Sequence, residues 1–209
     1  LGATVIPINP IYTPDEIAYI VNNGDVKAVV TLDQLVPLIE KMHHVLPKVE
    51  HFIICDTSQG QALEKDLSAL SAYPKMKSFT KLITSGDPGF KGPELEEDET
   101  AVILYTSGTT GKPKGAMLTH KNLYSNAKDV SDYLHMNEND RVITTLPMFH
   151  VFCLTVALNA PLMNGATILI DPKFSPKEIF RLAQKYKPTV FAGVPTMYNF
   201  LHQYEDGSP

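Results

Sequence analysis

The side chains best suited to chemistry in this sequence are concentrated between Leu104 and Gly115. This segment combines glycines, four Thr and Ser hydroxyls and two lysines, and it contains no acidic residue. Glycine lets successive backbone N–H groups turn to one side without Cβ clashes. Hydroxyl, N–H and ammonium donors around one concavity suit a polyphosphate. The segment therefore predicts a phosphate-binding loop, and a plain flexible surface loop is the alternative.

The spacing of the glycines excludes two common phosphate-binding loops. The P-loop requires G-x-x-x-x-G-K-[ST], whereas Gly108 and Gly111 are three residues apart and Pro113 follows Lys112. The dinucleotide pattern G-x-G-x-x-G is also absent from this segment. The loop nevertheless follows a predicted strand at 101–105, which is where α/β sheets bind ligands.

Hydrophobic periodicity predicts alternating strands and helices on both sides of this loop. Strands are expected at residues 4–8, 28–32, 51–55, 116–118, 141–146, 166–170 and 189–192. Helices are expected from Thr13-Pro14, after Asp33, at 63–70, 76–83, 122–134 and 151–163, after Ser175, and at 196–204. Such alternation is typical of βαβ units with mainly parallel sheets.

We therefore expect an α/β fold made of two tandem, Rossmann-like βαβ sub-domains. The boundary is placed near residue 92, so that the first sub-domain covers 1–92 and the second, which carries the phosphate loop, covers 93–209. The acidic run from Glu94 to Glu99 follows this boundary and is interpreted as a solvated linker, because it lacks the Asp/Asn and Gly pattern of a calcium loop.

The residues Tyr105–Gly115 resemble the AMP-binding signature of the adenylate-forming superfamily, which includes acyl-CoA synthetases, luciferases and peptide-synthetase adenylation domains. Three further segments resemble motifs of the superfamily in the same order, namely Gly2–Pro10, Pro147–Phe152 and Gly193–Thr196. These segments span nearly the whole chain. Pro147–Phe152 is most similar to the bacterial long-chain fatty-acid–CoA ligases, so the chain resembles part of the N-terminal domain of such an enzyme.

The resemblance implies a two-step reaction that uses ATP, Mg²⁺ and CoA. A fatty-acid carboxylate attacks the α-phosphorus of ATP and releases pyrophosphate, and the CoA thiol then displaces AMP to give acyl-CoA. Lys114 and His150 are the implied catalytic residues, and Thr106 is the implied Mg²⁺ ligand. Lys114 ranks above Lys112, because it occupies the signature position that takes Lys or Arg. The implied ATP-phosphate contacts are Thr106, Ser107, Gly108, Thr109, Thr110, Gly111, Lys112 and Lys114.

The same resemblance implies that His150, Phe152 and Val194 line the acyl pocket, with Tyr198 as a further wall residue. A structural histidine before a buried helix and ordinary core roles for Val194 and Tyr198 are the alternatives. The adenine, ribose, hinge and C-terminal lysine motifs of the superfamily are not found in these 209 residues. The sequence also starts without Met and stops in a loop signal, so we expect a piece of a longer protein with little activity alone.

Several alternatives to a long-chain fatty-acid–CoA ligase remain open. The acid could be medium-chain or aryl, and the acceptor could be a carrier-protein thiol. A phosphoryl-transfer NTPase would instead give ADP and phosphate, and a non-catalytic module would have no product.

The composition is compatible with a globular enzyme that acts on small-molecule substrates. Hydrophobic residues make up 44% and charged residues 20%, and the net charge of −5 disfavours general nucleic-acid binding. No apolar run reaches the roughly 20 residues that cross a bilayer. Cys55 and Cys153 lie in apolar stretches and are interpreted as reduced, buried thiols, which together with the absence of a cationic leader predicts a cytoplasmic location. A peripheral membrane contact and a homodimer stay open.

Overall fold

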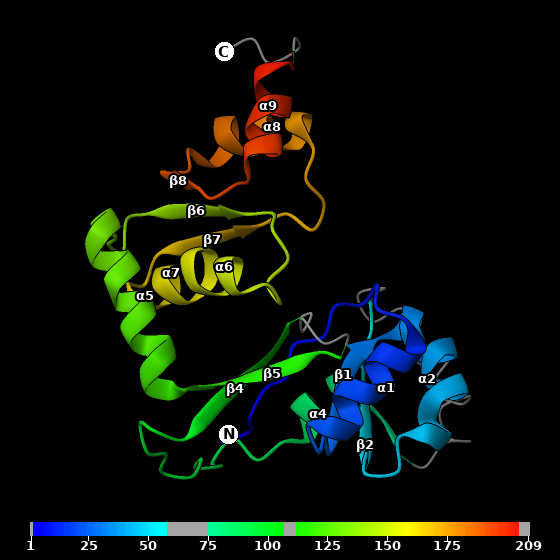
Figure 1. Cartoon of the computed structure of the whole chain (residues 1–209). Coiled ribbons are helices and arrows are strands. Elements are labelled where there is room, and N and C mark those ends of the chain that lie inside the picture. The colour runs from blue at the N-terminus through cyan, green and yellow to red at the C-terminus, as the bar shows by residue number, and fades with distance from the viewer. Residues whose placement is uncertain (1, 58–74, 107–111, 205–209) are drawn as a thin grey trace. The chain divides into compact units, whose positions relative to one another are not determined.

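The computed structural model describes residues 2–57, 75–106 and 112–204, which divide into two compact units (Figure 1). The main change from the first unit to the second falls between Glu94 and Leu95. The division is not a single cut, because Ala3–Pro7 belongs to the second unit and the described part of Tyr105–Gly115 belongs to the first. Each unit is an α/β assembly with its own core.

The first unit is built on a parallel sheet with the strand order β1-β2-β3, formed by Ala28–Leu32, His51–Cys55 and Met76–Ser78. Its helices are α1 (Pro14–Asn23), α2 (Val36–Met42) and α4 (Phe79–Ser85). The short 3₁₀ turns Asp33–Leu35 and His43–Val45 flank α2. The core joins β2 to helices α1 and α2, and its buried members include Val21, Ile39, Met42, Phe52 and Ile54.

Local sequence explains where α1 begins. Thr13 accepts a hydrogen bond from the Glu16 N–H at 3.3 Å, and the Glu16 carboxylate accepts from the Thr13 N–H at 2.8 Å. This reciprocal pair is a capping box, and Pro14 occupies the first helical position, where its missing N–H costs nothing. The predicted start of this helix is confirmed.

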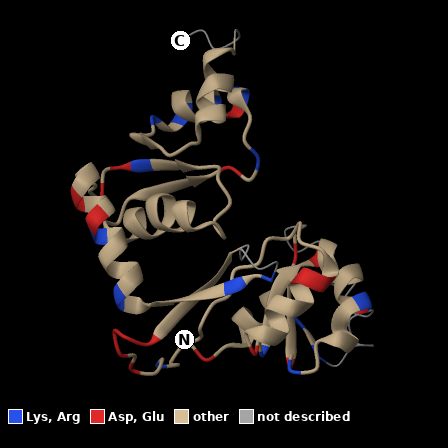
Figure 2. Cartoon of the chain, viewed as in Figure 1, with Lys and Arg blue, Asp and Glu red and all other residues tan. Residues whose placement is uncertain are grey.

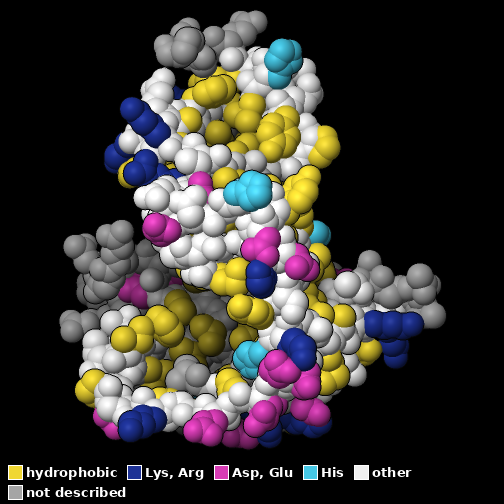
Figure 3. Space-filling view, turned by 90° about the vertical axis from the view of Figure 1, so that its left-hand side faces the viewer, with side chains coloured by type: hydrophobic (Ala, Val, Ile, Leu, Met, Phe, Trp, Pro, Cys, Tyr) yellow, Lys and Arg dark blue, Asp and Glu magenta, His cyan; other side chains and the backbone are white. Residues whose placement is uncertain are grey.

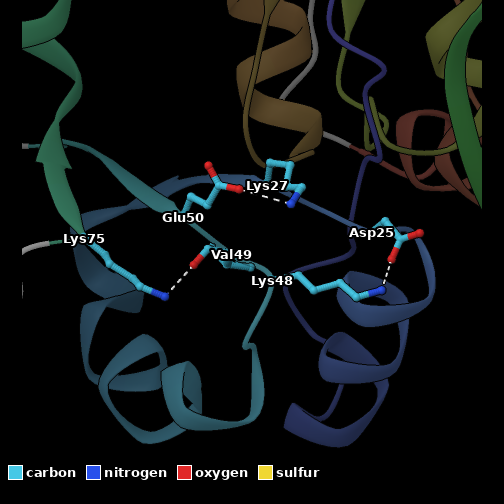
Figure 4. A network of polar contacts seen from close by, with 6 residues as sticks. All are labelled: Asp25, Lys27, Lys48, Val49, Glu50 and Lys75. Carbon is cyan, nitrogen blue, oxygen red and sulfur yellow. Dashed lines mark hydrogen bonds and ion pairs between the residues drawn. The ribbon is translucent and has the colours of Figure 1, made fainter.

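Polar contacts join the segments that enter the first sheet (Figure 4). Lys27 binds Glu50 at 3.0 Å, Lys48 binds Asp25, and the Lys75 ammonium donates to the Val49 carbonyl at 2.8 Å. Both ion pairs are exposed, so water and salt screen them and each contributes little to stability. They fix the side chains beside β1 and β2 rather than supplying the main energy of the fold.

Two elements predicted in the first 92 residues are wrong. The segment 76–83 was expected to be one helix, but Met76–Ser78 pairs with β2 as strand β3 and only Phe79–Ser85 is helical. The predicted strand at 4–8 is reduced to a single parallel bridge from Val5 to Val102. In both cases pairing with a distant segment decides the backbone, and local propensity does not contain that information. The predicted helix at 63–70 lies outside the described residues.

The second unit contains a parallel sheet with the order β7-β6-β8, formed by Thr167–Ile170, Arg141–Thr144 and Val190–Phe191. The central strand β6 is buried on both faces. Val142 packs with Ala127 of α5 (His120–Leu134), whereas Ile143 packs with Ile179 of α8 (Pro176–Tyr186). Helices on both faces are the usual cover of a parallel sheet, so the predicted α/β fold with mainly parallel sheets is confirmed.

The strands β4 (Thr100–Thr106) and β5 (Lys114–Thr119) form a separate two-stranded sheet. The acidic run Glu94–Glu99 precedes β4 and is exposed throughout (Figure 2). Its carbonyls accept from the start of α5, because the Lys121 N–H donates to Glu97 at 2.8 Å and the His120 N–H donates to Glu99 at 3.1 Å. The run is thus a solvated connection that also satisfies N–H groups at a helix start.

The predicted helix at 151–163 is present but not uniform. It consists of α6 (Val151–Cys153), a π-helical segment (Leu154–Asn159) and α7 (Ala160–Met163). Pro161 supplies no N–H to an α-helical ladder, which fits the altered hydrogen-bond pattern just before it. The chain then passes through β7, α8 and β8 to α9 (Pro195–His202). Within the described ranges, no helix is long and apolar enough to cross a bilayer.

Asp140 links the starts of β6 and β8. Its carboxylate accepts from the Thr189 hydroxyl at 2.6 Å and from the Asn137 N–H at 2.8 Å. The Thr189 and Asn137 hydrogen bonds lower the pKa of Asp140 below its ordinary value of 3.8. A depressed carboxyl pKa stabilises the fold above the unfolded-state pKa, and this stabilisation is lost as pH falls through the folded-state pKa.

Replacing Asp140 with asparagine should therefore lower the free energy of unfolding at pH 7 by less than about 1 kcal/mol, because the site is open to solvent. The difference in free energy of unfolding between Asp140→Asn and wild type should shrink as the pH falls below 3.8. Urea unfolding of both proteins at several pH values measures this. An equal difference at pH 7 and pH 2.5 would show that the charge of Asp140 plays no part.

Candidate active site

Two strands carry the ends of the predicted phosphate loop. Thr106 is the last residue of β4 and Lys114 is the first residue of β5, and these two strands are neighbours in one sheet. Both side chains are exposed. Ser107, Gly108, Thr109, Thr110 and Gly111 lie outside the described residues. The sheet therefore brings a hydroxyl and an ammonium group to the two ends of the signature.

The two lysines of the signature have different surroundings. The Lys112 ammonium lies 5.9 Å from the centroid of the Tyr19 ring, within the range of a cation–π contact. Lys114 makes no ion pair with any residue in the described part of the chain. Lys114 is thus the more available cation for an anionic ligand, which agrees with its position in the signature.

His150 is the residue that caps the helical run starting at Val151. Its Nδ1 accepts a hydrogen bond from the Phe152 N–H at 3.3 Å, and its carbonyl accepts from the Leu154 N–H at 3.0 Å. Because Nδ1 is the acceptor, the proton of the neutral imidazole is on Nε2. His150 is exposed, so its Nε2–H is a donor that can face a ligand while the other ring nitrogen holds the helix start.

The residues predicted to line the acyl pocket gather at one edge of the second sheet. His150 and Phe152 follow β6, and Val194 follows β8, the strand paired with β6. The carboxyl ends of parallel strands meet at a single edge, where α/β sheets bind ligands. Apolar side chains remain at the surface where α8 and α9 lie, in the upper part of Figure 3. Phe152, Val194 and Tyr198 are all exposed, at 41%, 39% and 48%.

Gly193 allows a close approach of two aromatic rings beside this edge. A Cβ at residue 193 would lie 3.1 Å from Phe191 and 3.2 Å from Tyr198. The Tyr198 hydroxyl donates to the Phe191 carbonyl at 2.9 Å, and the two rings meet edge to face at 5.5 Å. These contacts hold the Tyr198 ring in place, and because Tyr198 is 48% exposed, its place in the pocket wall stays a prediction.

Replacing Gly193 with alanine should lower the free energy of unfolding by about 1–2 kcal/mol, because the hydrogen-bonded Tyr198 ring must move to admit the methyl group. Urea unfolding measures the loss. In a Tyr198→Ala background the same substitution should cost clearly less, since one of the two rings is gone. Equal costs in both backgrounds would contradict the role assigned to the Tyr198 ring.

Sequence reasoning missed two polar atoms at the same edge. Thr145 Oγ1 and Asp171 Oδ2 are buried and have no hydrogen-bond partner among the residues described. Thr145 follows β6 and Asp171 follows β7, and the Asp171 N–H donates to the Thr144 carbonyl at 3.0 Å. Asp171 directly follows the predicted strand at 166–170, and this position was the available signal, whereas Thr145 lies inside the predicted strand at 141–146 and gave no such signal. Buried polar atoms without partners mark places where a ligand group or water is expected.

A magnesium site made of protein side chains alone is not seen in the described ranges, where no group of three or more His, Cys, Asp or Glu could hold a metal ion. Mg²⁺ in phosphoryl chemistry needs few protein ligands, because it keeps waters and binds the substrate phosphates. The exposed position of Thr106 at the end of β4 is compatible with such a site.

Comparison with known proteins identifies the class of molecule that this fold and site define. Residues 1–208 match the family of AMP-binding enzymes, and the chain belongs to this family. It is 32% identical to a long-chain-fatty-acid–CoA ligase of Bacillus subtilis and 28% identical to a medium-chain-fatty-acid–CoA ligase of Ectopseudomonas oleovorans, in alignments that cover 98% and 99% of the chain. The predicted resemblance to acyl-CoA ligases is confirmed.

A solved structure supports the same conclusion. ATP-bound MatB from Rhodopseudomonas palustris matches 98% of the chain with a TM-score of 0.79 and 30% identity. The chain spans only 39% and 37% of the length of the two curated ligases and 37% of MatB. The matched part of these proteins is thus about two-fifths of each.

Proposed function

We propose that the protein is an AMP-forming acyl-CoA ligase that activates a fatty acid, with long-chain acids as the first substrate class. Membership of the AMP-binding family over residues 1–208 supports an adenylating reaction. The observation that carries the proposal is the placement of Thr106 and Lys114 at facing ends of two paired strands, with the signature between them. The ligase named for long-chain acids favours that class, and the one named for medium-chain acids keeps chain length open.

In the first step a carboxylate attacks the α-phosphorus of ATP and the bond to the β-phosphate breaks, giving acyl-adenylate and pyrophosphate. The barrier is lowered by positioning the two anions and by neutralising charge on the leaving pyrophosphate. Lys114 would supply the positive charge to the phosphates, and the hydroxyls of Thr106, Ser107, Thr109 and Thr110 would donate hydrogen bonds. In the second step the CoA thiol attacks the acyl carbonyl and AMP leaves.

His150 would act at the carboxylate end of the acid. Its Nδ1 is committed to the Phe152 N–H, so an Nε2–H donor is available to a carboxylate or adenylate oxygen. Phe152 and Val194 would provide apolar contacts for the acyl chain. Mg²⁺ bound to the phosphates would further neutralise their charge, and Thr106 is the residue suited to hold it.

The nature of the products decides between this proposal and its alternatives. The full-length protein is incubated with ATP, Mg²⁺, CoA and a panel of long-chain, medium-chain and aryl acids. AMP and pyrophosphate formed only with an acid present, together with acyl-CoA, are expected. ADP and phosphate would indicate an NTPase, AMP without acyl-CoA would indicate another acceptor, and no turnover with any acid would overturn the proposal.

We propose that the protein is located in the cytoplasm. Cys55 and Cys153 carry free thiols, which suits the reducing cytoplasm, and cell fractionation would check this placement.

A further inference from the structure

Helix α1 contacts two residues of the AMP-binding signature, Tyr105 and Lys112, although the sequence places Asn23 of the helix 82 residues before Tyr105. The Tyr105 hydroxyl donates to Asn23 Oδ1 at 2.6 Å, and the Lys112 ammonium lies over the Tyr19 ring. Tyr105 precedes the hydroxyl-rich positions and Lys112 follows them. All four residues belong to the first unit.

Tyr19 and Asn23 are four residues apart on α1, so their side chains lie on the same face one turn from each other. One helix face therefore contacts both Tyr105 and Lys112, the residues on either side of the hydroxyl-rich positions. The helix is itself fixed by its capping box and by the buried residues Ile20 and Val21, at 1% exposure each. The contacts are thus made to a rigid support rather than to a loop.

The chemistry of each contact suits this role. Burial raises the pKa of the Tyr105 hydroxyl, and Tyr19 and Asp25 raise it further, so the group stays a protonated donor at neutral pH. The Tyr19 ring attracts the Lys112 ammonium by its quadrupole without neutralising the charge, as a carboxylate would. Lys112 is exposed within the signature.

We propose that Tyr19 and Asn23 of helix α1 are positioning residues for ATP, which hold Lys112 and Tyr105 in place on either side of the hydroxyl-rich positions 106–110 of the AMP-binding signature. The proposal deepens the proposed function and depends on ATP being the ligand of this site. A side chain that is already held loses less conformational freedom when the ligand binds. Loss of either contact should therefore weaken ATP binding without changing the chemistry of the acid.

The test measures two quantities in the full-length protein: the dissociation constant of a non-hydrolysable ATP analogue, β,γ-imido-ATP, and the steady-state constants for pyrophosphate release. Tyr19→Leu removes the ring and should raise the dissociation constant and the KM for ATP about two- to fivefold. The kcat and the KM for the acid should stay within about twofold. Tyr19→Phe keeps the ring face and should restore wild-type values.

Double variants test whether the two residues of each pair act on ATP binding through their mutual contact. Tyr19→Leu combined with Lys112→Met should weaken analogue binding no more than the stronger single variant, and Asn23→Leu combined with Tyr105→Phe should behave likewise. Tyr133→Leu, an 84% exposed tyrosine on α5, is the matched control and should change nothing. Multiplying effects in both double variants, or an unchanged dissociation constant in Tyr19→Leu, would overturn the inference.

The two readouts separate this inference from the proposed function. A wild-type protein that binds the analogue but forms no AMP would contradict the ligase proposal, whereas the coupling between Tyr19 and Lys112 would still be measured by binding. A wild-type protein that does not bind the analogue would overturn both.

Discussion

Replacing Lys114 with alanine in the full-length protein should lower kcat for pyrophosphate release about 10²–10³-fold, the loss typical of removing one group that stabilises transition-state charge. Lys114 begins β5, is exposed and has no ion-pair partner among the residues described. In the proposed reaction its charge would act on the leaving pyrophosphate. Pyrophosphate release with saturating ATP and acid measures the effect.

Two further variants test whether the loss of kcat is due to the positive charge of Lys114. Lys114→Arg keeps a cation at the position and should retain most of the activity. Lys41→Ala removes an exposed lysine in the last turn of α2 and should leave kcat unchanged. Unfolding in urea should be alike for all three variants and wild type, because none of these side chains is buried. A Lys114→Ala protein with wild-type kcat would contradict the role assigned to the charge of Lys114.

Replacing Phe52 with alanine should cause the largest loss of stability, about 3–5 kcal/mol in the unfolding of the first unit. Phe52 is 2% exposed on β2, the middle strand of the sheet, where it is paired in register with Val29 of β1 and Met76 of β3. Its ring packs in the cluster that joins the sheet to α1 and α2. Alanine there removes apolar contacts and leaves a cavity that strands on both sides prevent from closing. Urea unfolding measures the change.

A second phenylalanine of the same unit serves as the control. Phe90 is 60% exposed, so Phe90→Ala should change the free energy of unfolding by no more than about 0.5 kcal/mol. If Phe52→Ala unfolds within 1 kcal/mol of wild type, the cluster around β2 is not the core of the first unit.

Elements with strong local signals could be predicted from the sequence. The strands 28–32 and 51–55 have the predicted bounds, and the helix at Thr13-Pro14 begins with the predicted capping box. These signals are local because a cap joins residues three apart, and a run of β-branched residues favours extended backbone by itself. The prediction of a helix at 76–83 was wrong because Met76–Ser78 pairs with β2 as a strand, and that partner is more than 20 residues away.

The identity of the family was also determined by the sequence alone, since the residues of the signature are consecutive and need no fold to be recognised. Only the tertiary structure decided which groups surround them. It assigned Lys112 to the Tyr19 ring, left Lys114 without an ion pair in the described part of the chain, and committed His150 Nδ1 to a helix start. It also joined Tyr105 to Asn23 across 82 residues. Such contacts depend on how separate segments pack, and hydrophobic burial drives that packing without leaving a local pattern in the residues that it brings together.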